Sequence, residues 1–112
     1  MKIEIIASSE FEKEYKRLKK KYKSLPQDLV SFEQDLNNNP NLGVDLGNNI
    51  RKIRLSIKSK NKGKSAGARL ITYNIIVSVI ERTVLLVTIF DKSEEANITD
   101  AEIKRIIKNS GL

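Results

Sequence analysis

A change in hydrophobic period near Ile50 restricts the fold of this chain more than any other sequence feature. Before Ile50, apolar side chains recur every three or four residues, which is the spacing of an amphipathic helix. After Ile50, apolar and basic residues alternate, which is the pattern of a strand with one buried face. Helices followed by a run of strands are typical of the α+β class, so we predict an α+β fold.

The N-terminal half predicts one strand followed by a helical hairpin. Residues 2–6 alternate as a short strand, and Ser8 or Ser9 then caps the first helix. A Ser-Leu-Pro sequence at residues 24–26 separates the helices, because Ser is a good cap and Pro is tolerated in a first helical turn. The Asn-rich segment 37–41 ends the second helix. The apolar stripes consist of Phe11, Tyr15, Leu18 and Tyr22 in the first helix and Leu25, Leu29, Phe32 and Leu36 in the second.

The C-terminal half predicts a three-stranded antiparallel meander. Its first strand starts at Ile50, and a basic loop at residues 59–67 leads into a long second strand at residues 68–78. A turn at residues 80–83 precedes an almost unbroken apolar run at residues 84–90. Such a run suits a central strand that is buried on both faces.

A final helix and the chain length complete the predicted architecture. Thr99 and Glu102 have capping-box spacing, and the helix that they begin stops before Gly111. A chain of 112 residues cannot divide into two stable cores, so we predict one domain over residues 1–112. Charged residues interrupt the apolar stretch at 70–90, so no segment is expected to cross a membrane. The N-terminus lacks the apolar core of a signal peptide, and we expect a cytoplasmic protein.

The composition limits both the chemistry and the partners of the protein. The sequence contains no His and no Cys, which excludes imidazole acid–base catalysis, thiol nucleophiles and the usual zinc ligands. We therefore expect no metal and no cofactor. Twenty-one Lys and Arg residues against fourteen Asp and Glu residues give a net charge of +7, and the resulting positive field favours polyanions such as nucleic acid.

Three segments of the second half resemble the RelE/ParE toxin superfamily. They are Lys52-Ile53-Arg54-Leu55, Gly67-Ala68-Arg69-Leu70-Ile71-Thr72-Tyr73 and Ile89-Phe90-Asp91-Lys92-Ser93. The loop at residues 62–69 is similar to the HigB-related branch, whose members carry Gly-Lys/Arg-Ser-Gly-Gly-Ala-Arg here. The resemblance implies the RelE-like microbial ribonuclease fold and a bacterial toxin of a type II toxin–antitoxin system.

The resemblance also implies an activity and a set of partners. Members of the RelE branch cut messenger RNA on the ribosome, by attack of a ribose 2′-hydroxyl on the adjacent phosphodiester. Fixed cations stabilise the negative charge that the phosphoryl oxygens gain in this transition state, so no metal is required. The implied partners are mRNA, the ribosome and a cognate antitoxin, which we expect to be a helix-turn-helix protein.

Four residues match positions of the family's catalytic site, and Tyr73 is a fifth candidate because of its place on the strand. Arg69 matches an Arg that contacts phosphate, and a planar guanidinium can bind two phosphoryl oxygens at once. Lys52 and Arg54 match a Lys-x-Lys pair, of which Lys52 alone could accept a proton, and only with a depressed pKa. Tyr73 has the strand parity of Arg69, and it either stacks on a base or donates a proton, or else packs at the edge of the core. Lys92 matches a basic position at the rim of the site.

Two positions depart from the family pattern. Ser93 stands where the family usually has an important Arg, and Thr99 falls near the position of the catalytic Tyr. The general acid is therefore unassigned. A weakened toxin, a different set of catalytic groups and RNA binding without cleavage all stay open.

Basic residues in or beside the predicted loop are candidates for sequence-independent contacts to RNA phosphates. These candidates are Lys58, Lys60, Lys62 and Lys64. Two other functions remain possible on the same scaffold: a ParE-like inhibitor of DNA gyrase and a catalytically inactive RNA-binding or regulatory module. The basic strand and the Gly-Ala-Arg sequence favour the ribonuclease.

Overall fold

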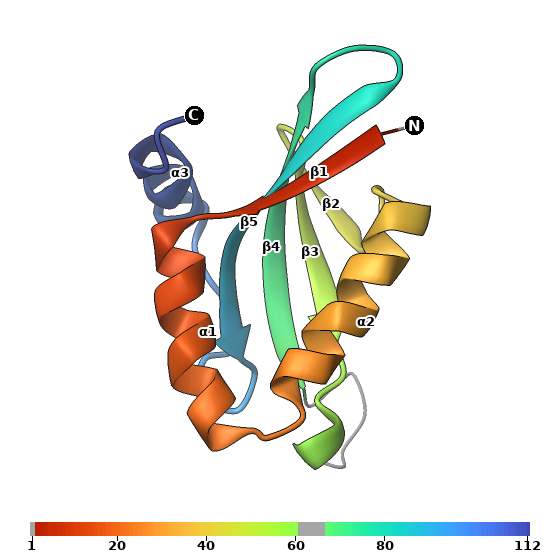
Figure 1. The fold of residues 1–112 in the computed structure, drawn as a ribbon. Helices are drawn as coiled ribbons and strands as arrows, with labels where there is room; N and C mark the ends of the chain where they lie inside the picture. The colour runs from red at the N-terminus through yellow and green to blue at the C-terminus, as the bar shows by residue number, and fades with distance from the viewer. Residues whose placement is uncertain (1, 61–66) are drawn as a thin grey trace.

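The structure is a computed structural model that describes residues 2–60 and 67–112 (Figure 1). The elements are β1 (Lys2–Ala7), α1 (Ser9–Lys21), α2 (Leu25–Asn38), β2 (Val44–Gly47), β3 (Ile50–Leu55), the short 3-10 helix η1 (Lys58–Lys60), β4 (Ala68–Ile76), β5 (Glu81–Asp91) and α3 (Asp100–Asn109). This order confirms the predicted α+β class, with a helical hairpin after the first strand and a helix at the C-terminus.

The strands form one five-stranded sheet in the order β1-β5-β4-β3-β2. β1 pairs with β5 in parallel, whereas the other three pairs are antiparallel. β5 therefore lies between β1 and β4, and its residues 84–91 are all buried. The prediction of a central strand at residues 84–90 is confirmed, and the predicted meander accounts for β3, β4 and β5.

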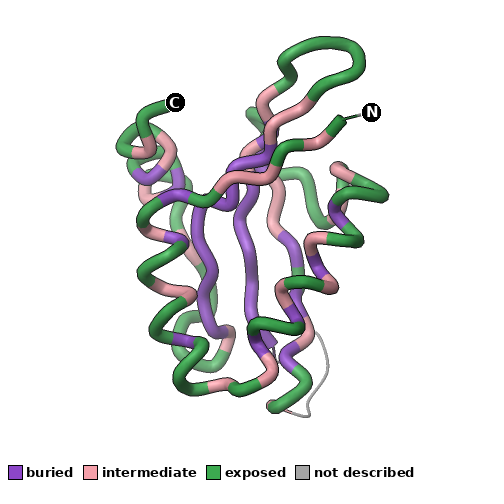
Figure 2. The backbone as a smooth tube through the Cα atoms, in the orientation of Figure 1, coloured by how far each residue is buried: buried purple, intermediate pink, exposed green. Residues whose placement is uncertain are grey.

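Helices cover both faces of the sheet. The helical hairpin packs Phe11, Leu18 and Phe32 against Leu70 and Leu86 of the sheet. On the other face, α3 packs two isoleucines, Ile103 and Ile106, on a second cluster that includes Ile71, Leu85 and Val87. Figure 2 shows the consequence, since the two middle strands are buried along most of their length. α3 is short, so part of this second face extends beyond it.

Side-chain hydroxyls fix the starts of α1 and α3. The Phe11 N–H donates to Ser8 Oγ at 2.9 Å, so Ser8 rather than Ser9 is the cap of α1. Thr99 caps α3 as predicted, because its Oγ1 accepts from the Glu102 N–H at 3.2 Å. Ser24 precedes α2 without a side-chain capping bond; its hydroxyl instead donates to Asp28 Oδ2 at 2.7 Å.

The strand β2 is absent from the predicted architecture, and the sequence pattern explains why. β2 has four residues, all exposed, so it shows no alternation between buried and exposed positions. It joins β3 through Asn48 and Asn49, whose φ angles of 54° and 65° fit a two-residue hairpin turn. The segment before Ile50, for which the sequence pattern predicts no element, is thus the first arm of a hairpin.

The apolar stretch at residues 70–90 folds as a β-hairpin. β4 ends at Ile76 and β5 begins at Glu81, so the turn lies earlier than the predicted 80–83. The tip projects beyond the rest of the sheet (Figure 1). Within residues 2–60 and 67–112, no helix has the length and apolar character needed to cross a bilayer.

Candidate functional site

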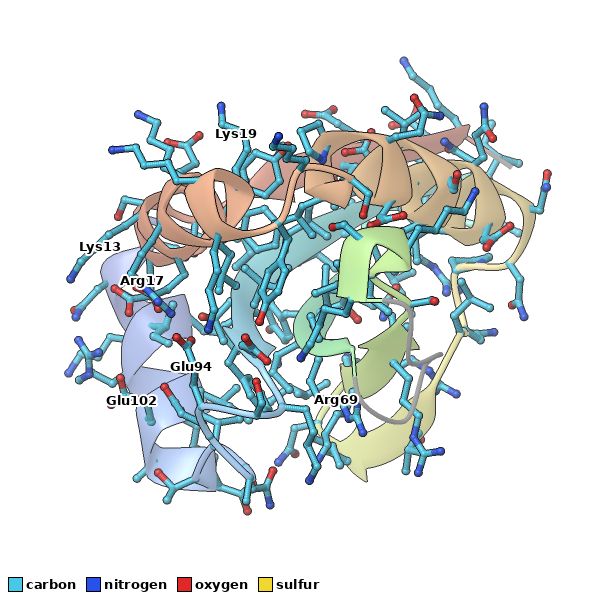
Figure 3. All side chains as sticks on the ribbon, turned by 90° about the horizontal axis from the view of Figure 1, so that it is seen from below. Lys13, Arg17, Lys19, Arg69, Glu94 and Glu102 are labelled. Carbon is cyan, nitrogen blue, oxygen red and sulfur yellow. The ribbon has the colours of Figure 1, made fainter. Side chains whose placement is uncertain are left out.

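The register between β3 and β4 brings three predicted site residues onto one face of the sheet. Arg54 lies directly opposite Arg69, and Lys52 lies opposite Ile71. Because strand side chains alternate, Lys52, Arg54 and Arg69 share a face, which we call the basic face. Figure 3 shows Arg69 on the side of the sheet that points away from α1 and α2.

Arg69 is a buried cation beside a second cation. Its side chain is 5% exposed, and its Nη1 donates to the Ala68 carbonyl oxygen at 3.2 Å. Burial lowers the pKa of Arg69, and the neighbouring charge of Arg54 lowers it further. Like charges on directly opposite strand positions repel, and an anion bound next to them would relieve this repulsion. The pair is therefore suited to phosphate.

The segment after β5 lies beside the basic face. The Lys92 N–H donates to the Gly67 carbonyl at 3.1 Å, two residues before Arg69, and Lys92 Nζ donates to the Ala96 carbonyl at 3.0 Å. Lys52 Nζ donates to Asn97 Oδ1 at 2.8 Å. Lys92 and Asn97 thus lie at two edges of the same site. No periodicity or motif in the sequence indicates the contact with Asn97.

Tyr73 lies on the strand and face of Arg69 but farther along the strand. Four residues separate the two, which corresponds to about 13 Å along a strand. Tyr73 lies opposite Ile50, is half-buried and packs against the cluster under α3. The structure therefore does not bring Tyr73 next to Arg69, and its packing matches the core-edge interpretation of the sequence.

The lysines predicted to contact RNA differ in their exposure to solvent. Lys58 is exposed, and its backbone N–H donates to Asp28 Oδ2 at 3.2 Å. The side chain of Lys60 is only 9% exposed, and its Nζ lies 2.8 Å from Asp91 Oδ1. This ion pair gives Lys60 a role inside the protein. Lys62 and Lys64 lie outside the described residues.

Asp91, at the end of β5, is a fully buried carboxylate with several donors. Besides Lys60, its oxygens accept from the Tyr22 hydroxyl, from Ser93 N–H at 2.9 Å and from Ser93 Oγ at 2.6 Å. Burial alone would raise the pKa of Asp91, but the hydrogen bonds from Lys60, Ser93 and Tyr22 outweigh it and hold the pKa well below its usual range. Asp91 is thus ionised at neutral pH. Sequence reasoning missed this network.

The basic residues of α1 attach this helix to the segment after β5. Arg17 Nη2 lies 2.7 Å from Glu94 Oε1, and Lys21 Nζ lies 3.4 Å from both Glu94 and Asp91. Figure 3 shows Arg17 and Glu94 facing each other between the helix and the segment. The hydrogen bond from Arg17 lowers the pKa of Glu94. Arg17 and Lys21 are thus engaged in ion pairs within the protein.

Ser93 and Thr99, which depart from the family pattern, both make hydrogen bonds within the protein. Ser93 binds Asp91, and the Thr99 hydroxyl caps α3. Neither side chain is thus placed as a general acid next to Arg69. Among the residues that the structure describes, no three Asp or Glu side chains gather in a way that could hold a metal ion.

A groove of about 380 Å³ lies between α2 and the outer edge of β3. Phe32, Leu42 and Leu55 contribute apolar lining, while Lys52 and Arg54 also border it. Arg69 does not line this groove, so only one member of the cation pair, Arg54, borders it. The groove therefore adjoins the basic face on the side of α2.

Comparison with known proteins identifies the family of this chain. A search of the curated proteins finds no match to this chain. Residues 9–111 match the model of a protein family described as the RelE toxin of the RelE/RelB toxin–antitoxin system. The matched region runs from the start of α1 through α3 and includes every described residue of the basic face. The chain therefore belongs to the RelE toxin family.

Proposed function

We propose that this protein is an mRNA endonuclease that inhibits translation by metal-independent cleavage on the ribosome. The observation that supports it best is the cross-strand pair of Arg54 and Arg69, which places two positive charges together on one sheet face. Toxins of this family are generally endoribonucleases. The similarity of the loop at residues 62–69 to the HigB-related branch supports placing the chain in that branch.

In the proposed reaction, the 2′-hydroxyl oxygen of one nucleotide attacks the adjacent phosphorus. The bond to the 5′-oxygen of the next nucleotide breaks, which leaves a 2′,3′-cyclic phosphate and a 5′-hydroxyl end. Arg69 and Arg54 bind the phosphoryl oxygens, whose negative charge grows in the transition state. Lys52, which hydrogen-bonds Asn97, is the candidate proton acceptor.

The other predicted residues have supporting roles in this proposal. Lys92 contributes positive charge at the rim, and the exposed Lys58 contacts a phosphate farther along the RNA. Tyr73, about 13 Å along β4 from Arg69, is too far to act on the same phosphate and contacts a neighbouring nucleotide instead. The leaving oxygen takes its proton from water or from a ribosomal group, because neither Ser93 nor Thr99 is placed to donate one.

Induced expression in bacteria tests this function against its alternatives. We expect primer extension to map new 5′ ends within codons of translated frames, and the ends to vanish when initiation is blocked. Cleavage by purified protein on programmed ribosomes should need no metal beyond the magnesium that the ribosome itself requires, since fixed cations perform the electrostatic role of a metal at the cleavage site. Intact transcripts with gyrase-trapped DNA breaks would establish the ParE-like function. Tight RNA binding without cleavage would establish the inactive module.

Membership of the family implies a cognate antitoxin. We propose that an acidic antitoxin segment crosses the basic face and occludes or displaces α3. Its affinity should fall about tenfold or more between about 50 mM and about 500 mM salt, because screening weakens attraction between exposed charges. Titration calorimetry at the two salt concentrations measures this. An affinity that does not change with salt would contradict the electrostatic docking.

A further inference from the structure

Asp91 connects three separate parts of the chain through one buried carboxylate. Its Oδ2 accepts from the hydroxyl of Tyr22, the residue that follows α1, and from Lys21 Nζ at 3.4 Å. Its Oδ1 accepts from Lys60 Nζ of η1 and from both the N–H and the hydroxyl of Ser93. With 0% exposure, the Asp91 side chain cannot contact RNA directly. Any effect of Asp91 on the site must act through other residues.

The backbone of Asp91 also shapes the segment that follows. Its carbonyl oxygen accepts from the N–H groups of Glu94 and Glu95, each at 3.0 Å, which closes a tight turn. The segment that contains this turn also reaches the basic face. There the Lys92 N–H donates to the Gly67 carbonyl oxygen, and Asn97 Oδ1 accepts from Lys52 Nζ. Residues 92–97 are therefore attached to Asp91 on one side and to the candidate site on the other.

We propose that Asp91 is a positioning residue that fixes the 92–97 segment, so that Lys92 and Asn97 are held at the basic face. The role in cleavage rests on the proposed function; the anchoring itself does not. Lys60 belongs to this anchor, since its ammonium is mostly buried and also lies 5.2 Å from the Tyr22 ring centroid. The anchor is on the α1 side of the sheet, opposite the RNA-binding side.

The charge of Asp91 is essential to this anchor. A carboxylate has two acceptor oxygens, whereas the amide of Asn has one acceptor and one donor group. Asp91→Asn therefore keeps the size of the side chain but cannot accept from Tyr22, Lys60 and Ser93 together. It also leaves the buried ammonium of Lys60 without its counter-charge. Tyr22→Phe removes a single hydrogen bond and serves as a milder second variant.

Hydrogen exchange tests the anchoring without reference to RNA. In Asp91→Asn, we expect the amides of Lys92 and Glu95 to exchange about tenfold faster or more, beyond any change in global stability. Tyr22→Phe should show a smaller effect of the same kind. Leu36→Val is the control, because it weakens the core under α2 at a buried residue that does not line the groove beside Lys52 and Arg54. Unchanged local exchange in Asp91→Asn would overturn the proposal.

Cleavage kinetics on programmed ribosomes test the consequence for the site. We expect Asp91→Asn to lower kcat about tenfold or more with KM within about twofold, because displaced catalytic groups slow the chemistry more than the binding. Leu36→Val should keep the wild-type kcat at a temperature where both variants are folded. A kcat unchanged in Asp91→Asn, or lowered equally in the control, would contradict positioning. If the wild type does not cleave RNA, the proposed function fails, and hydrogen exchange still decides the anchoring.

Discussion

Replacing Arg69 by Met should lower the rate of mRNA cleavage by about 10²–10³-fold, because it removes a cation aimed at the developing phosphoryl charge. The unfolding free energy should change by no more than about 1 kcal/mol. Met retains most of the aliphatic volume of this buried side chain, and relief of the repulsion with Arg54 offsets the loss of hydrogen bonds such as the one to the Ala68 carbonyl. Single-turnover cleavage and denaturant unfolding measure the two quantities separately.

Arg105→Met is the matched control for this experiment. Arg105 is an exposed residue of α3 that pairs with Glu102 in the same helix, away from the β3–β4 pair. The control makes the same chemical change and should keep full cleavage. If Arg69→Met still cleaves at the wild-type rate, or is inactive only because it unfolds, the assignment of Arg69 is wrong.

Replacing Gly67 by Ala should cost about 2–3 kcal/mol of stability and abolish toxicity. A Cβ atom at this position would lie 2.0 Å from the Leu55 carbonyl oxygen and 3.3 Å from the Ile57 nitrogen, so the backbones of β3 and β4 must separate. The same movement would break the hydrogen bond from Lys92 to the Gly67 carbonyl. Thermal unfolding and growth inhibition measure the two effects.

Gly111→Ala provides the comparison for backbone effects alone. Gly111 has a φ of +82°, which strains any L side chain, but no atom lies near its Cβ position. We expect a loss of about 1 kcal/mol at most and normal toxicity, because Gly111 is at the end of α3. Equal effects of the two substitutions would show that contact with β3 does not explain the requirement for Gly67.

Local sequence patterns predict the parts of this fold that depend on local interactions. Alternation after Ile50 places Lys52 and Arg54 on one face, and the β3–β4 register confirms it. Two residues that share a face of one strand need not be close to each other, however. Tyr73 therefore has the predicted face but lies about 13 Å along β4 from Arg69. β2 escapes prediction because all four of its residues are exposed, which leaves no hydrophobic period to detect.

Contacts between distant residues account for the parts of the site that sequence reasoning missed. Lys60 and Asp91 are 31 residues apart, and Lys52 and Asn97 are 45 residues apart. A lysine in a basic stretch predicts a solvated cation, and only the folded chain shows that Lys60 has a buried counter-charge. One sequence feature could have indicated the network around Asp91, namely an Asp at the end of an apolar strand. A carboxylate that is buried there requires hydrogen-bond donors.

The parallel pairing of β1 with β5 has a consequence for synthesis of the toxin. The Ser8 hydroxyl donates to the Val87 carbonyl, 79 residues along the chain, and β5 separates β1 from β4 in the sheet. Pairings this distant form late, because closing a long loop costs entropy before any contact is made. A chain interrupted before residue 81 lacks β5, the strand with which both β1 and β4 pair. A fragment of this kind leaves β4, which carries Arg69, without one of its two neighbouring strands.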